Sequence, residues 1–307
     1  MKITDNLQAY LLRSIGFCLR RFSIKRVQRM AEFLGRFFYR YLPVRKDVAL
    51  ANLKLCFPEK SQDELEYIIA RCYINVATVF FEFLYFPRFT EKSLGELVEF
   101  RDESRELIES ALAKGKGLVM ISGHFCNWEL IAFSVGRFYP KRFLVIVHPL
   151  SNRAADVLTD KYRRLLGNST VPMGNSIRAA LTELHSNGIV ALLADQSAAK
   201  ESAPAKFCGI EVPTFQGPAS FALKTGAAVH VGFLIRKEDG RYSVELKEID
   251  CSDLKDDSEE SVKELTQRHV TVLEEYVRRY PEWWLWFHRR FKHVPAYQEL
   301  FAKMKKK

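Results

Sequence analysis

The sequence lacks the cysteine patterns of metal sites. Its six cysteines include no pair with CxxC spacing, and none is arranged with histidine as in a zinc site. We therefore expect reduced cytosolic thiols that serve as small apolar residues. They stand at positions 18, 56, 72, 126, 208 and 251.

No uncharged apolar run reaches the roughly 18–20 residues that a transmembrane helix needs. The first residues, MKITDNLQAYLLRSIGFCLRRF, contain an interrupted apolar segment without a small-residue cleavage site, so we expect no cleaved signal peptide. Repeats and low-complexity tracts are also missing. The 307 residues, 48% hydrophobic and 27% charged, have the composition of a globular protein with a sizeable core.

The net charge of +10 is concentrated at the two ends of the chain. Residues 1–46 carry eleven basic and two acidic side chains, and residues 289–307 carry seven basic and one acidic, so the part between them is net acidic. A nucleic-acid-binding protein more usually spreads basic residues over its binding face. Basic ends on an acidic body favour contact with an anionic membrane surface, and no nucleic-acid partner is expected.

The segment 23–43 predicts a helix with Ser23 as N-cap and Pro43 as its stop. Two interpretations remain open, a surface helix packed on the core or an interfacial helix lying among anionic headgroups. Residues 7–22 would be a first, shallow segment of the same anchor. We expect residues 1–45 to form basic amphipathic anchoring helices and residues 46–307 one α/β domain. The apolar stripe of the helix is Ile24, Val27, Ala31, Leu34, Phe38 and Tyr41.

The rest of the chain predicts an α/β fold with a mostly parallel central sheet flanked by helices, because short apolar strands alternate with helical patterns. A capping box, Ser61 to Glu64, opens a long helix whose aromatic end is expected in the core. The linker RKEDG predicts a hairpin. Strands are expected at 117–122, 142–147, 189–194, 227–235 and 241–249, and helices at 61–86, 102–114, from 123 to about 136, 152–166, 176–188 and 261–280.

Polar residues follow three of these strands. His124 follows the first strand, His148 the second, and Asp195 and Gln196 the third. Functional groups of open α/β sheets gather at the carboxyl ends of strands, so GHFCNWE (123–129) and ADQ (194–196) should lie along one edge. An imidazole accepts a proton near neutrality, and does so better when a carboxylate holds one tautomer. We expect His124 in a turn that Gly123 allows, with Glu129 one helical turn inside and pointing back.

GHFCNWE resembles the HxxxxE/D motif of the late lipid A acyltransferases, the family of lauroyl and myristoyl transferases, and more distantly the glycerolipid acyltransferases. Four further segments match the same family in the right order, and together they span roughly residues 45–295. These segments are ANLKLCFPEKSQDEL (51–65), SNRAADVLTDKYRRLLG (151–167), LLADQ with GIEVPTFQGPASFALKTGAAV, and YPEWWLWFHRRFK (280–292).

The resemblance implies acyl transfer from an acyl-thioester to a hydroxyl of a membrane glycolipid, a lipid A precursor, at the cytoplasmic face of a bacterial inner membrane. It implies acyl carrier protein, or acyl-CoA, as co-substrate, with no other cofactor and no metal. His124 would act as general base and Glu129 would orient it. Backbone N–H groups near Asn127–Glu129 and the side chain of Arg164 are candidates to stabilise the oxyanion. The expected substrate-binding residues are Arg164, Asn127, Asn152, Asp195 and Gln196.

Other interpretations remain open at this point. The acceptor could be another membrane glycolipid or a lysophospholipid, and a non-catalytic lipid-binding protein on a membrane surface is a different class of function. Cys126 could act as a nucleophile with His124. WWLWF (283–287) could be plain core or an aromatic belt at a membrane interface.

Overall fold

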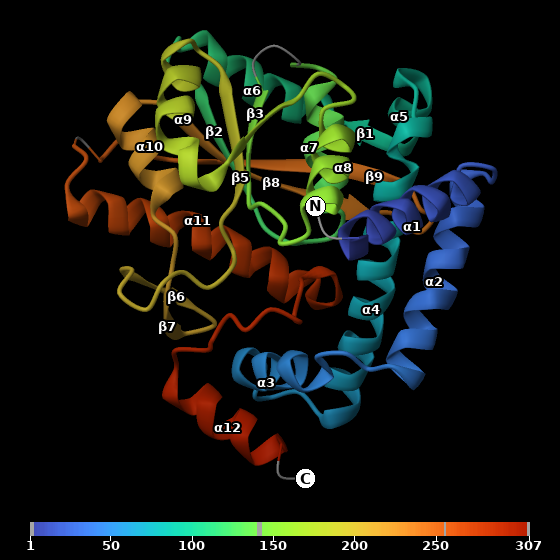
Figure 1. The fold of residues 1–307 in the computed structure, drawn as a ribbon. Coiled ribbons are helices and arrows are strands. Elements are labelled where there is room, and N and C mark those ends of the chain that lie inside the picture. Colours follow the sequence, from blue (N-terminus) through green and yellow to red (C-terminus); the bar gives the residue numbers. More distant parts are fainter. Residues whose placement is uncertain (1–2, 140–142, 255, 306–307) are drawn as a thin grey trace.

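A computed structural model describes residues 3–139, 143–254 and 256–305. Its centre is a seven-stranded sheet with the order β1-β9-β8-β2-β5-β3-β4. Every pair of neighbouring strands is parallel except the β8–β9 hairpin, so the predicted mostly parallel α/β fold is confirmed (Figure 1). A separate two-stranded antiparallel unit, β6–β7, lies below this sheet in the view of Figure 1.

The five predicted strands are present, and four short strands were not predicted. The predicted second strand begins at residue 142, which lies outside the described residues. The strands are β1 (Val98–Phe100), β2 (Leu118–Ser122), β3 (Phe143–Val147), β4 (Ser169–Pro172), β5 (Ile189–Leu193), β6 (Pro204–Phe207), β7 (Ile210–Pro213), β8 (Ala228–Arg236) and β9 (Tyr242–Ile249).

The predicted helices are also present, and the capping box between Ser61 and Glu64 is formed at the start of α4. The α-helices are α1 (Ile3–Leu19), α2 (Ile24–Tyr41), α3 (Lys46–Cys56), α4 (Gln62–Tyr85), α5 (Glu91–Leu97), α6 (Asp102–Ala113), α7 (Trp128–Gly136), α8 (Arg153–Arg163), α9 (Ser176–His185), α10 (Gly217–Thr225), α11 (Glu259–Arg279) and α12 (Pro295–Lys305). Short 3-10 turns lie at Phe86–Arg88, Met173–Asn175 and Pro281–Trp283.

Helices cover both faces of the sheet, as adjacent residues of β8 show. Gly232 faces Ile131 of α7, whereas the ring of Phe233 packs on Tyr276 of α11 at 4.6 Å. Successive strand residues point to opposite faces, so α7 and α11 lie on opposite sides. Helix α10 packs against both α9 and α11.

The N-terminal helices α1 and α2 both pack against α4. In the predicted stripe of α2, Val27 and Ala31 are fully buried, in agreement with a helix packed on the core. Tyr41, which was predicted in that stripe, belongs instead to a second apolar stripe that faces outward and was otherwise not predicted. The 3-, 4- and 4-residue spacing of this second stripe places it on one side of the helix. It consists of Met30, Phe33, Phe37 and Tyr41, which are 40%, 72%, 41% and 67% exposed.

Among the described residues, one helical stretch, Gln62–Arg88, is long and apolar enough to cross a membrane by length and composition. Most of its apolar window, 61%, is buried inside the protein. Its aromatic end packs in the core, as predicted, where Phe86 stacks on Phe133 of α7 with ring centroids 4.2 Å apart.

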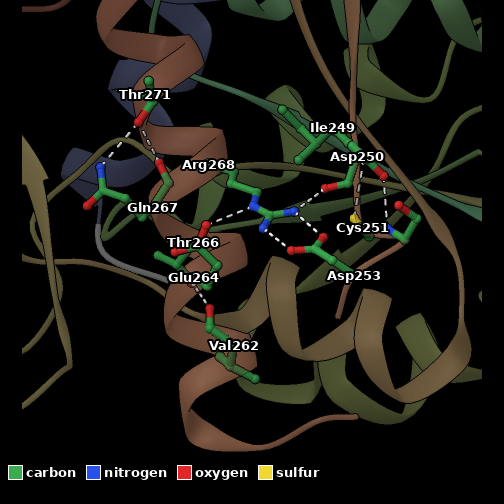
Figure 2. Close-up of polar contacts among 11 residues, drawn as sticks. Ile249, Asp250, Cys251, Asp253, Val262, Glu264, Thr266, Gln267, Arg268 and Thr271 are labelled. Atoms are coloured by element: carbon green, nitrogen blue, oxygen red, sulfur yellow. Dashed lines mark hydrogen bonds and ion pairs between the residues drawn. The ribbon is translucent and has the colours of Figure 1, made fainter. Parts of the chain in front are cut away.

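The acidic segment before α11 is fixed to that helix by Arg268. Its guanidinium binds both carboxylate oxygens of Asp253 at 2.6 and 2.7 Å and the carbonyl oxygen of Asp250 at 2.7 Å (Figure 2). Glu264, one turn earlier on α11, accepts a further bond from the same guanidinium. These bonds hold Asp250 and Asp253 against α11.

The expectation of six reduced thiols is wrong for one pair. Cys56, at the end of α3, forms a disulfide with Cys208, in the β6–β7 turn, across 152 residues of sequence. The other four cysteines are free. Spacing along the chain gave no sign of the pair, because only the tertiary fold brings α3 beside β6–β7.

Candidate active site

His124 lies in the turn between β2 and α7, where the carboxyl ends of two neighbouring strands meet. Ser122 of β2 is in register with Leu193 of β5, which brings the residues after each strand together. The space at Gly123 is tight, because a Cβ atom there would lie 3.2 Å from the Asp195 side chain and 3.0 Å from Leu273, and these side chains would have to shift. The left-handed residue of the turn is Cys126 (φ 48°), not Gly123 as the predicted sharp turn implied.

The carboxylate that holds His124 is Asp195. Asp195 Oδ1 lies 2.8 Å from His124 Nδ1, and Asp195 Oδ2 accepts the backbone N–H of His124 at 2.8 Å. Trp284 Nε1 donates to the same Oδ2 at 2.8 Å. The carboxylate is 2% exposed, and its ordered donors fix the imidazole with Nε2 directed away from Asp195.

This contact shifts the pKa of both partners. Burial lowers the pKa of His124, but the charge and hydrogen bond of Asp195 outweigh burial, and the pKa is raised above its ordinary value. Burial raises the pKa of Asp195, yet the charge of His124, its two bonds and Trp284 lower it to about 2. Asp195 therefore stays ionised while His124 exchanges a proton.

Glu129 has a different partner from the one predicted. Its carboxylate receives a bidentate pair from Arg163, with Nε at 2.8 Å and Nη2 at 2.5 Å. Glu129 still raises the pKa of His124 through its charge, so the two side chains share one site. The prediction that Glu129 orients the imidazole is wrong in this geometry, because Asp195 occupies Nδ1.

Arg164 lies away from this cluster. It is half exposed and binds Asp160 at 3.0 Å and the hydroxyl of Thr170 at 2.8 Å. Its neighbour Arg163 lines the cavity at the site instead. Of this adjacent pair only Arg163 lies at the cavity, since helix α8 ends here and Arg163 faces Glu129 of α7.

Gln196 lies beside the imidazole, as predicted. Its Nε2 is 3.2 Å from His124 Nε2 and 3.4 Å from Nδ1. The carbonyl oxygen of Gln196 accepts a hydrogen bond from Nη1 of Arg290 at 2.8 Å. Arg290 is 1% exposed, and burial lowers its pKa to about 10. A buried cation thus holds the loop after β5.

Asn127 and Asn152 are N-caps in this structure. Asn127 Oδ1 accepts the N–H of Leu130 at the start of α7, and Asn152 Oδ1 accepts the N–H of Ala155 at the start of α8. Asn127 is 1% exposed, and neither residue is among those that line the cavity. Their predicted role in substrate binding has no support in these positions.

A cavity of about 530 Å³ opens at His124 and runs between α7 and strands β2, β3 and β5. His124, Glu129, Arg163 and Gln196 line its polar end. Its walls are mostly apolar and include Met120, Ile131, Phe133, Val135, Phe143, Val145 and Ala191. Leu150, Met173 and Phe215 line it too and are 45%, 38% and 36% exposed, so they form an apolar rim.

Two alternatives from the sequence, Cys126 as a nucleophile and WWLWF as a membrane belt, fail against the geometry. Cys126 is fully buried, and burial raises the pKa of its thiol to about 12, which removes the thiolate that a nucleophile needs. Trp284 and Trp286 are buried in the core, so WWLWF forms no exposed belt there. Within the described residues, no group of three or more His, Cys, Asp or Glu side chains is placed to hold a metal ion.

The sequence model of the family "Bacterial lipid A biosynthesis acyltransferase" matches residues 1–293. The chain belongs to this family. Its relatives include the lipid A biosynthesis lauroyltransferase of Escherichia coli, 24% identical over 272 residues, which are 88% of this chain and 86% of the relative. The palmitoleoyltransferase of the same organism is 24% identical over 83% of this chain and 81% of its own length. A lipid A biosynthesis acyltransferase of Haemophilus influenzae is 26% identical over 78% and 73%.

Membership of this family identifies the chain as an acyltransferase. Sequence reasoning missed three residues of the candidate site, namely Arg163, Trp284 and Arg290. Trp284 and Arg290 lie in the aromatic-basic segment 280–292 that matches the family. A tryptophan N–H and a guanidinium in such a segment are donors that need partners when buried, and this was the available signal.

Proposed function

We propose that this enzyme transfers a fatty acyl chain from an acyl-thioester, carried by acyl carrier protein, to a hydroxyl of a lipid A precursor. The supporting observation is the His124–Asp195 pair at the polar end of a deep apolar cavity. Family membership supports the lipid A acceptor. The reaction would take place at the cytoplasmic face of a bacterial inner membrane.

His124 acts as the general base in this proposal. With Nδ1–H donated to Asp195, Nε2 takes the proton of the acceptor hydroxyl as its oxygen attacks the thioester carbonyl. The tetrahedral intermediate then collapses, the C–S bond breaks, and the imidazolium returns the proton to the leaving thiolate. Asp195 stabilises the imidazolium that exists between these steps. No acyl-enzyme forms, and no cofactor beyond the thioester substrate takes part.

The oxyanion is stabilised at the start of α7. The backbone N–H groups of Trp128 and Glu129 have no acceptor in the part of the chain that the structure describes, and both residues line the cavity. Arg163 keeps the Glu129 side chain folded against α8, which leaves these N–H groups open. The exposed Arg164 has no part in this step.

The acyl chain occupies the apolar cavity, and its carbonyl lies at His124. The lipid acceptor approaches across the rim of Leu150, Met173 and Phe215. Helix α1 packs on α8 and exposes Leu7, Tyr10, Leu11 and Phe17, while α2 exposes its outer stripe among arginines. These apolar faces bordered by basic residues support binding to an anionic membrane by α1 and α2.

The test is transfer of a labelled acyl group, from acyl carrier protein and separately from acyl-CoA, to a panel of lipid acceptors, with wild type and His124→Ala side by side in detergent. We expect the wild type to acylate a lipid A precursor and the variant to fall to background. Labelling of a different lipid would overturn the acceptor assignment, and transfer from acyl-CoA alone would overturn the donor. Equal activity of both proteins would overturn His124 as the base.

A further inference from the structure

The side chain of Glu82 is fully buried inside the protein, at 0% exposure, in the last turn of α4. Three hydrogen-bond donors converge on its carboxylate. Gln28 Nε2 donates at 2.7 Å, Asn127 Nδ2 at 2.6 Å, and Tyr242 Oη lies 2.9 and 3.0 Å from the two oxygens. A buried carboxyl is costly unless such donors satisfy it, and the steps described above make no use of it.

One of these donors connects Glu82 with the catalytic turn. Asn127 uses its amide nitrogen on Glu82 and its amide oxygen to cap α7 through the N–H of Leu130 at 3.0 Å. Asn127 is three residues from His124 and closes the turn that presents the imidazole. On the other side of this turn, Asn75 of α4 donates to the carbonyl oxygen of Cys126 at 3.0 Å.

We propose that Glu82 is a positioning residue for the reaction of His124, which acts by fixing Asn127 and thereby the turn Gly123–Asn127. This inference rests on the proposed function, because the reaction is the one assigned to His124 there. Glu82 touches neither the cavity nor the imidazole among the described contacts, so its effect passes through Asn127.

The contact requires both oxygens of the Glu82 side chain to accept hydrogen bonds. Gln28, Asn127 and Tyr242 all donate, and a carboxylate accepts from all three. In Glu82→Gln one oxygen becomes an NH₂ group, which has the same size but meets an N–H donor. Either Gln28 or Asn127 must then turn away. A catalytic turn released by a fraction of an ångström loses rate rather than affinity.

The experiment compares Glu82→Gln with Thr78→Ala, a matched buried change one turn earlier on α4, where the hydroxyl bonds only the carbonyl oxygen of Ile74 in its own helix. At a temperature where both variants are fully folded, we expect Glu82→Gln to lower kcat at least tenfold and to keep KM within twofold of the wild-type value. We expect Thr78→Ala to keep wild-type kcat. In an Asn127→Ala background, Glu82→Gln should cause no further loss of kcat.

A second readout needs no turnover. The amide of Leu130 is protected by Asn127 Oδ1, so Glu82→Gln should accelerate its hydrogen exchange at least tenfold while the amides of β2 stay protected. If wild type itself transfers no acyl group, the proposed function fails and this exchange still decides the positioning role. Wild-type kcat in Glu82→Gln, unchanged Leu130 exchange, or losses that add to those of Asn127→Ala would each overturn the inference.

Discussion

Asp195 Oδ1 lies 2.8 Å from Nδ1 of His124, across the ends of two neighbouring strands. The contact joins residues 71 positions apart, and Trp284 fixes the second oxygen of the same carboxylate. The contact therefore brings together segments from three parts of the chain, and in the proposed reaction they act as one proton-transfer unit. Its charge balance also sets the pH at which His124 is free to accept a proton.

Replacement of Asp195 by Asn should lower kcat by about 10²–10⁴-fold, because the imidazolium loses its stabilising charge and its preferred tautomer. The wild-type pKa of His124 is raised, so wild-type kcat/KM should increase with pH through an apparent pKa above 6.5, and this pKa should fall in Asp195→Asn. A pH–rate series measures both. Asp253→Asn, an exposed carboxylate on Arg268, is the control and should leave the profile unchanged. An unshifted profile in Asp195→Asn would contradict the assignment.

Replacement of the two adjacent arginines at the end of α8 should have sharply different effects on kcat/KM. Arg163→Ala leaves the mostly buried Glu129 carboxylate without its bidentate partner, a loss of about 1.5–3 kcal/mol, and should lower kcat/KM at least tenfold. Arg164→Ala removes only a half-exposed pair and should stay within twofold of wild type. Both expectations are checked by steady-state kinetics of the two variants, measured under conditions where the same fraction of each is folded. A larger effect for Arg164 would restore it to the site.

The depth of the cavity should determine which acyl chains fit. Ala191 of β5 lines the apolar wall, and Ala191→Leu adds bulk there at a cost of about 1–3 kcal/mol in stability. We expect the ratio of long-chain to short-chain transfer to fall at least tenfold, measured with acyl carrier proteins that bear chains of different length. A general folding defect would lower all donors equally, so an unchanged ratio would show that the chain lies elsewhere.

The outer stripe of α2 should carry membrane binding. Phe33→Ser together with Phe37→Ser removes two exposed aromatic side chains, each worth up to about 1.5–3 kcal/mol when fully buried in an apolar phase. Co-sedimentation with anionic vesicles should weaken at least tenfold while the unfolding temperature is kept. Phe33→Tyr with Phe37→Tyr is the conservative control. Equal binding of the Ser variant would exclude this face as the docking surface.

The Cys56–Cys208 bond should contribute to stability because it closes a long loop. Chain-entropy arguments for such loops give about 2–5 kcal/mol. Urea unfolding with and without a reductant should show this difference in wild type, and Cys56→Ser should unfold at the reduced midpoint in both conditions. Six titratable thiols in the denatured, unreduced protein would show that the bond is absent.

The fold class and the pairing of GHFCNWE with ADQ at one sheet edge could be predicted, because alternating strands and helices and the strand-end rule are local patterns. The partner of the His124 imidazole could not be predicted from the sequence. Spacing along the chain favoured Glu129, but side-chain direction on α7 turns it toward Arg163. The register of β2 against β5, which brings Asp195 to Nδ1, is a property of the assembled sheet.

The same limit explains the other differences. Helical periodicity finds a stripe on α2 but does not say which of two apolar stripes is covered, and α4 covers the one with Val27 and Ala31. Arg163 and Arg164 are adjacent in the sequence and are the same residue type. Only the folded structure shows that Arg163 faces Glu129 and Arg164 faces Asp160. Short strands such as β1 and β4 have three and four residues, which are too few to show the alternation of apolar and polar residues that identifies a strand.

The bond from Trp284 to Asp195 and that from Arg290 to the Gln196 carbonyl both come from the end of the sequence. The turn Gly123–Asn127 is also paired with this segment. The N–H of Leu285 donates to the carbonyl oxygen of His124, and the N–H of Cys126 donates to the carbonyl oxygen of Trp283. A nascent polypeptide therefore has no complete centre until almost all of it has left the ribosome. Premature termination upstream of Trp284 would yield a chain without the donor to Asp195 and without the pairing of this turn, so we expect unfinished chains to be inert.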